Sequence, residues 1–119
     1  ELPALTPAEL SVRTGEKGEK GEPSMAVAAR VAAARERQMA RQGKTNRELT
    51  GRETDDVCRL DAASEALLRE ASERFRWSAR AYYRVLKVAR SIADLAGDMM
   101  PNAGQIAEAV QYRRVFPAG

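Results

Sequence analysis

The sequence predicts an all-α protein, a small bundle of four to five helices preceded by a flexible linker. Only 5% of the 119 residues are aromatic and alanine is the commonest apolar residue, which suits closely packed helices better than a sheet. Apolar residues recur at helical spacing between residues that typically begin or end helices. No stretch shows a convincing strand pattern.

The N-terminal part of the chain is not expected to contribute to the core. Residues 1–12 contain two prolines and are interpreted as an entry segment. Residues 13–23, RTGEKGEKGEP, contain no apolar residue and are predicted to form a solvated linker. The helical domain is therefore expected over residues 24–116.

The first predicted helix begins after Ser24 as its N-cap and ends at Gly43. One side of its helical wheel is largely apolar, with Arg35 in the middle of that side. This side comprises Val27, Ala28, Val31, Ala32, Gln38 and Met39. The other side carries Arg30, Arg37 and Arg41, which are candidates for contact with nucleic acid or another subunit. A solvated basic face is the simpler interpretation.

Four later helices are predicted from their capping residues. Thr50 and Glu53 form a capping box that starts a short helix ending near Cys58. Asp61 caps the next helix, and its expected inward residues are Ala63, Leu67, Leu68, Ala71 and Phe75. Ser78 caps a helix that ends at Gly97, and Asn102 with Gln105 opens the last, which is expected to end near Arg113 or Arg114.

Composition excludes several functions for the chain alone. It has no histidine and one cysteine, so Ser/His and Cys/His nucleophile pairs and the usual zinc sites are absent. No phosphate-binding glycine loop is present, so we expect no catalytic residues and no metal site within this sequence. Cys58 is expected to be a core residue, and Phe75 and Trp77 to pack between helices. The single cysteine favours a cytoplasmic location, and no apolar run is long enough to cross a membrane.

The helix after Ser78 is strongly amphipathic. Its predicted polar side carries Arg80, Arg84, Lys87, Ser91 and Asp94. Arg80 lies in the first turn, where a cation is unfavourable by roughly 0.3–1 kcal/mol, and Arg84 follows one turn later. This arrangement favours the binding of an external anion. The alternative is a solvated face on which Arg90 and Asp94 form an ordinary i,i+4 pair.

The same segment carries a family resemblance. Residues 78–95 read SARAYYRVLKVARSIADL and resemble the S-A-R-A-x-x-R-[VI]-L-[KR]-V-A-R-T-I-A-D-L segment of magnesium-chelatase-like AAA+ ATPases of the ComM (YifB) type. Blocks at residues 30–38, 58–61 and 107–113 agree in order and spacing. Tyr83 and Gln105 stand where the family usually has histidine, so no role of those histidines carries over.

The resemblance implies the helical lid of an AAA+ ATPase, with residues 1–12 as the exit from an absent large domain. It implies that Arg80 is the sensor-2 arginine that contacts ATP, with Arg84 as a second candidate. ATP with Mg²⁺ would be held mainly by the large domain, and Lys87 and Arg90 would contact that domain or another subunit. The implied protein is a homo-oligomeric ring, a hexamer, that hydrolyses ATP and acts on DNA in recombination or transformation.

Two alternatives remain open at this point. The domain is the lid of a magnesium-chelatase motor subunit, or it is a stand-alone helical module that binds DNA through Arg30, Arg37 and Arg41. The formal net charge of only +3 argues against the second alternative.

Overall fold

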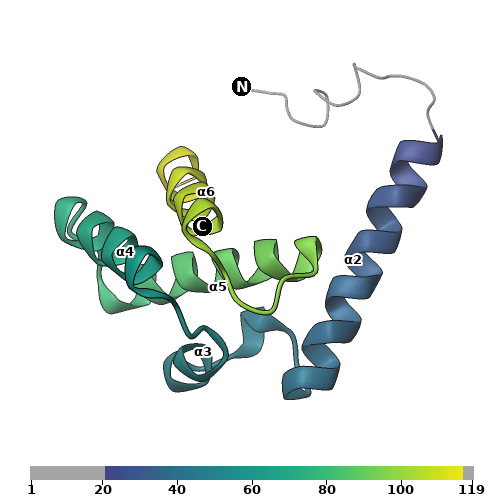
Figure 1. Cartoon of the computed structure of the whole chain (residues 1–119), viewed down its shortest axis with the longest axis horizontal. Coiled ribbons are helices and arrows are strands. Elements are labelled where there is room, and N and C mark those ends of the chain that lie inside the picture. The colour runs from purple at the N-terminus through teal and green to yellow at the C-terminus, as the bar shows by residue number, and fades with distance from the viewer. Residues whose placement is uncertain (1–20, 117–119) are drawn as a thin grey trace. The chain divides into compact units, whose positions relative to one another are not determined.

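The computed structural model describes residues 21–116, which contain helices and no strand, so the all-α prediction is confirmed for this range (Figure 1). In chain order the elements are α2 (Gly21–Gln42), the 3-10 helix η2 (Asn46–Glu48), α3 (Gly51–Val57), α4 (Ala62–Arg74), α5 (Ala79–Ala96) and α6 (Ala103–Val115). Residues 1–12 and the first part of the predicted linker lie outside the described residues. The chain divides into two compact units, Glu1–Ala32 and Ala33–Gly119.

The described part of the first unit is the N-terminal portion of α2. This helix is already present at Gly21, so Ser24 lies inside it and is not its N-cap. The helix therefore extends into the predicted linker. Pro23 is compatible with this, because the first turn of a helix needs no backbone N–H donor. Val27 and Val31, expected on the apolar side, are 48% and 44% exposed.

The C-terminal portion of α2 belongs to the second unit. Ala34 and Gln38 are its buried residues, whereas Arg35 is exposed and Met39 is 49% exposed. The buried face is therefore centred between the predicted apolar and basic sides. The helix ends as predicted, because Gly43 has a φ of 75° and donates its N–H to the carbonyl of Met39.

The predicted caps of the later helices are confirmed. Thr50 and Glu53 form the capping box of α3, and the side chain of Asp61 accepts from the backbone N–H of Ser64 at the start of α4. Ser78 caps α5 in the same way, and α5 ends at Gly97, whose φ is 80°. A further capping box opens α6, formed by Asn102 and Gln105.

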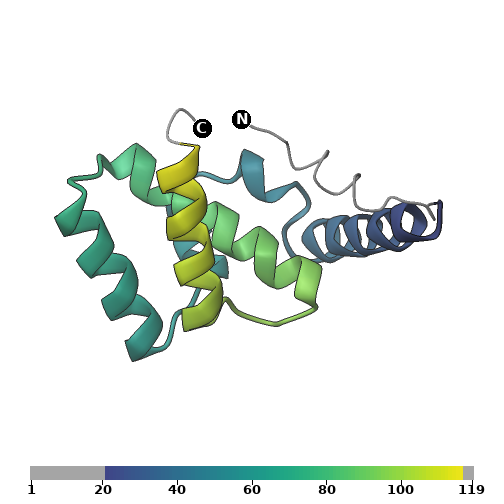
Figure 2. The same cartoon turned by 90° about the horizontal axis from the view of Figure 1, so that it is seen from above.

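The core lies where α5, α6 and α4 meet. α6 packs against both α5 and α4, while α3 and η2 pack against α5, and Figure 2 shows α6 crossing α5. The central buried residues are Cys58, Leu68, Val85, Leu86, Ala89, Ile106 and Ala109. Cys58 is thus a core residue as predicted, and burial raises the pKa of its thiol to about 11.

Two inward predictions for α4 are wrong. Ala63 is exposed, and its neighbour Ser64 is fully buried instead. Phe75 is 37% exposed, and its ring stacks on that of Trp77 with centroids 6.2 Å apart. Trp77 does pack against the core as expected. Within residues 21–116, no helix is both long and apolar enough to span a bilayer.

Candidate anion-binding groove on α5

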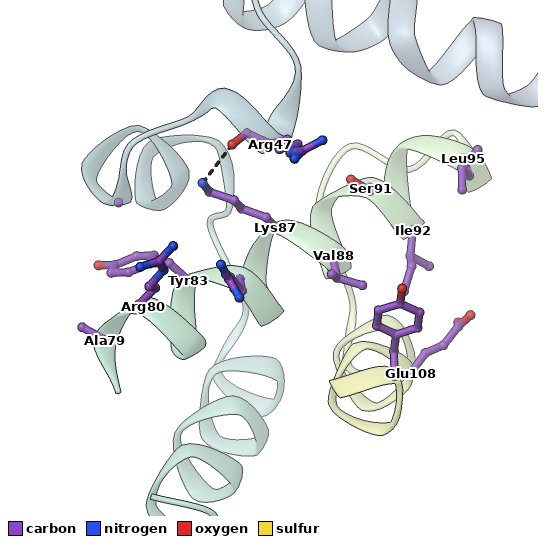
Figure 3. A pocket seen from close by; sticks show the side chains of 13 residues that line it. Arg47, Ala79, Arg80, Tyr83, Lys87, Val88, Ser91, Ile92, Leu95 and Glu108 are labelled. Carbon is purple, nitrogen blue, oxygen red and sulfur yellow. Dashed lines mark hydrogen bonds between the residues drawn. The ribbon is translucent and has the colours of Figure 1, made fainter. Parts of the chain in front are cut away.

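A groove of about 1150 Å³ runs along α5 (Figure 3). Its cationic end is formed by Arg47, Arg80, Arg84 and Lys87. Its other end is formed mainly by the apolar and aromatic side chains of Val88, Ile92, Leu95 and Tyr112. Glu108 also lines this end. The groove therefore suits a ligand or surface with an anionic part and an apolar part.

Arg80 and Arg84 lie one turn apart at the cationic end. The residue before α5, Ser78, accepts from the backbone N–H of Ala81 and so caps the helix where Arg80 begins to project. Arg80 is exposed and Arg84 is half-buried. Neither guanidinium donates a hydrogen bond or forms an ion pair with another described residue. Their N–H groups are therefore available to an external anion.

Lys87 and Arg47 complete the cationic end. The Lys87 ammonium donates to the backbone carbonyl of Arg47 across 3.2 Å, which fixes η2 beside α5. Sequence reasoning missed Arg47, because no periodicity links a short 3-10 turn to a helix forty residues later. The sequence indicates Arg47 only indirectly, because it lies between Thr45 and Glu48, the two residues of the capping box of η2.

Tyr83 holds α3 against this part of α5. Its hydroxyl donates to the carboxylate of Asp55 across 2.8 Å, and this hydrogen bond raises the pKa of Tyr83. A side chain at Gly51 would bring a Cβ within 3.2 Å of the Tyr83 ring, so glycine permits the close approach. Tyr83 thus braces the wall of the groove beside Arg80.

Asp94 was expected on the solvated side of α5 and is fully buried instead. Arg41 pairs with its carboxylate at 2.9 Å, and the amide of Asn46 donates to it at 2.9 Å. Arg37 donates to the Asp94 backbone carbonyl at 2.7 Å. Burial alone would raise the pKa of Asp94, but the bonds from Arg41 and Asn46 and the charges of the arginines outweigh it and hold this pKa below its usual value.

Arg90 is the second member of this buried cluster. It pairs with Asp94 at 3.1 Å, and both side chains are 0% exposed. Its guanidinium also donates to the carbonyls of Val57, Asp98 and Met99 at 2.9, 3.0 and 2.8 Å. Arg90 therefore joins the end of α3 and the α5–α6 loop to α5. The expectation that it contacts another domain or subunit is not supported, because its donors are directed inward.

The three arginines predicted on one face of α2 separate in the structure. Arg37 and Arg41 bind Asp94 and help attach the end of α2 to α5. Arg30 is exposed and belongs to the first unit. The structure therefore gives Arg37 and Arg41 internal partners, although both residues remain exposed, and this argues against a face dedicated to DNA binding.

The cationic end of the groove suits phosphate groups. Planar guanidiniums and an ammonium are good partners for phosphate oxygens. The described residues contain no group of three or more acidic or cysteine side chains that could hold a metal ion.

These features define a small all-α domain with an amphipathic groove. Residues 21–113 match the family model described as magnesium chelatase, subunit ChlI C-terminal, and the chain belongs to this family. It is 41% identical over 96 residues to competence protein ComM of Haemophilus influenzae, which covers 81% of this chain and 19% of ComM. It is 39% identical over 115 residues to the protein YifB of Salmonella typhimurium, covering 97% of this chain and 22% of YifB.

The chain spans about a fifth of the length of these curated relatives. No solved protein structure matches it. The resemblance in the sequence is confirmed, and the chain is a C-terminal helical domain of the ComM type.

Proposed function

We propose that this domain is the lid of a ComM-like AAA+ ATPase and that Arg80 is its sensor-2 arginine. The observation that carries the proposal is the position of Arg80, which is exposed at the first turn of α5 and makes no bond to another described residue. Membership of the magnesium chelatase C-terminal family supports it, because Arg80 lies in the S-A-R motif through which the sequence resembles ComM-type proteins.

Arg80 would act on charge that develops during phosphoryl transfer. Its guanidinium offers a planar fork to the γ-phosphate of an ATP·Mg²⁺ held mainly by the large domain of the same protein. Arg84 and Lys87 extend the positive charge along the same wall of the groove. A contact made only while nucleotide is present would couple the angle of the lid to the nucleotide state.

The assembled protein in this proposal is a homo-oligomeric ring, a hexamer. The apolar end of the groove gives such a ring a surface for its own large domain or a neighbouring subunit, because Leu95 and Tyr112 are exposed there. The motor would act on DNA in recombination or transformation, as the likeness to ComM suggests. A second candidate, the lid of a metal-chelatase motor, is favoured by the description of the family itself.

Steady-state ATP hydrolysis by the full-length ATPase that carries this domain tests the proposal. Arg80→Ala should lower kcat by about 100-fold or more, the size of effect seen when one donor to transition-state charge is removed. Arg35→Ala is the matched control, because it removes an exposed arginine outside the groove. Size-exclusion chromatography checks that the ring is intact. Equal turnover for both variants would rule out Arg80 as the sensor.

A further inference from the structure

The turn between α4 and α5 contains the one non-glycine residue of the described chain with a positive φ. This residue is Arg76, with a φ of 54°. Phe75 is the C-cap of α4, and Trp77 donates its backbone N–H to the carbonyl of Ser72 at 3.0 Å. Arg76 therefore occupies the position of the turn where glycine is usual. An L side chain is sterically disfavoured there. Strain of this kind is commonly retained where the side chain has a function.

Two more arginines converge beside this turn. The guanidinium carbons of Arg74 and Arg114 lie 5.6 and 5.2 Å from the centroid of the Phe75 ring. Arginine at this distance from an aromatic ring is held by a cation–π interaction while its N–H edges remain available. Arg74, Arg76 and Arg114 are exposed, and none of them donates a hydrogen bond or forms an ion pair with another described residue.

A small cavity opens next to the same ring. Its volume is about 280 Å³, and it lies between α4 and α6 with Leu67, Ala71 and Val110 among its apolar lining. Glu70 and Gln111 supply a hydrogen-bond acceptor and an amide at its rim. Ligand pockets usually measure roughly 300–1,000 Å³, so this cavity suits one small planar group and not a large ligand.

We infer that this surface binds single-stranded nucleic acid, with one base in the α4–α6 cavity and the neighbouring phosphates on Arg74, Arg76 and Arg114. Arginine forks fit phosphate oxygens, and an apolar cavity with a carboxylate and an amide at its rim fits the face and the edge of a base. A paired base cannot leave its duplex to enter such a cavity without losing its stacking. The inference rests on the proposed action on DNA but not on Arg80 or on ATP hydrolysis.

Fluorescence anisotropy of a labelled DNA oligonucleotide titrated with the 119-residue chain tests the inference. Arg76→Gly and Arg114→Gln should each weaken binding on the order of fivefold. Each should also reduce the slope of log affinity against log salt by about 0.7, the value for one phosphate contact on a single strand. Arg35→Ala removes the same charge elsewhere and should change neither quantity. Arg76→Gly relieves backbone strain, so a loss of affinity cannot be attributed to misfolding.

The base is tested separately from the phosphates. An abasic oligonucleotide should bind more weakly than the normal strand, and Ala107→Leu, which fills the cavity, should abolish that difference without changing the salt slope. Equal affinity of all variants for the strand would overturn the inference. So would displacement of the strand by ATP or poly-glutamate at matched charge, because the surface would then be a site for free nucleotide or for an acidic protein. Neither result depends on the turnover measurement that tests Arg80.

Discussion

Both halves of α5 carry charged side chains, but these side chains are at least partly exposed in the first half and buried in the second. In the first half, Arg80 and Arg84 line an open groove and bind no other described residue. In the second half, Arg90 and Asp94 are 0% exposed and joined at 3.1 Å. The difference comes from what lies over each half, because the end of α2, η2 and the α5–α6 loop all bond to the second half.

The comparison shows that one part of a polar helix face can be buried in structural contacts while another part stays exposed without partners among the described residues. A buried charge is tolerated only while its partners remain, so changing Asp94 should damage the fold. An exposed charge without partners contributes little to stability, so changing Arg80 should damage only function.

The largest effect is expected for Asp94→Ala. It leaves Arg90 and Arg41 near one another without their shared carboxylate, and breaking a buried pair in this way costs about 3–5 kcal/mol. Urea unfolding followed by circular dichroism measures the loss. A cost below about 1 kcal/mol would mean that the cluster is not structural and would remove the contrast between the two halves.

The same carboxylate should make stability depend on acid. The pKa of Asp94 is lower in the folded chain than its ordinary value, so its contribution is complete above the unfolded pKa, about 3.9, and is lost as pH falls through the folded pKa. The difference in unfolding free energy between wild type and Asp94→Asn should therefore be constant near neutral pH and shrink in acid. Because both proteins retain the other carboxylates, a difference that stays constant through the acid range would contradict this assignment.

A smaller effect of opposite sign is expected for Arg76→Gly, in the turn that precedes the first half of α5. Glycine removes the steric cost of the φ of 54°, so the chain should gain about 1 kcal/mol. A gain of that size raises the melting temperature by roughly 4–8 °C for a domain of this size. Differential scanning calorimetry measures it, and Arg76→Ala, which keeps the strain, is the control and should show no gain.

The smallest effect on stability is expected for Arg80→Ala. Surface substitutions without partners usually change the unfolding free energy by no more than about 0.5 kcal/mol. Urea unfolding of the variant beside wild type checks this. A loss of unfolding free energy comparable to that of Asp94→Ala would mean that Arg80 stabilises the fold. It would contradict the difference between the two halves of the helix.

Local features of the fold could be predicted from the sequence, and its longer-range contacts could not. Thr50, Asp61, Ser78 and Asn102 were identified as caps because capping depends on residues three positions apart. The predicted start of α2 is wrong because serine is a common N-cap residue, whereas Ser24 lies inside a helix that is already present at Gly21.

The burial of polar residues escaped prediction for a different reason. A helical wheel places Asp94 with Lys87 on one polar side, and only the arrival of Arg41 and Asn46 from other segments makes that position internal. Ser64 was passed over in favour of Ala63 because apolarity guided the choice, although the cap at Asp61 turns Ser64 inward. Arg80 and Arg84 could be singled out from their positions on one helix, whereas Arg47 reaches the groove only through tertiary structure.

Nucleotide sensing by the first half of α5 is best tested by the turnover of the proposed full-length ATPase with Arg80→Ala. We expect kcat to fall by about 100-fold or more while the ring stays assembled and the domain stays folded. A kcat within about twofold of wild type, measured on an intact ring, would contradict it, since loss of a donor to transition-state charge cannot be that small.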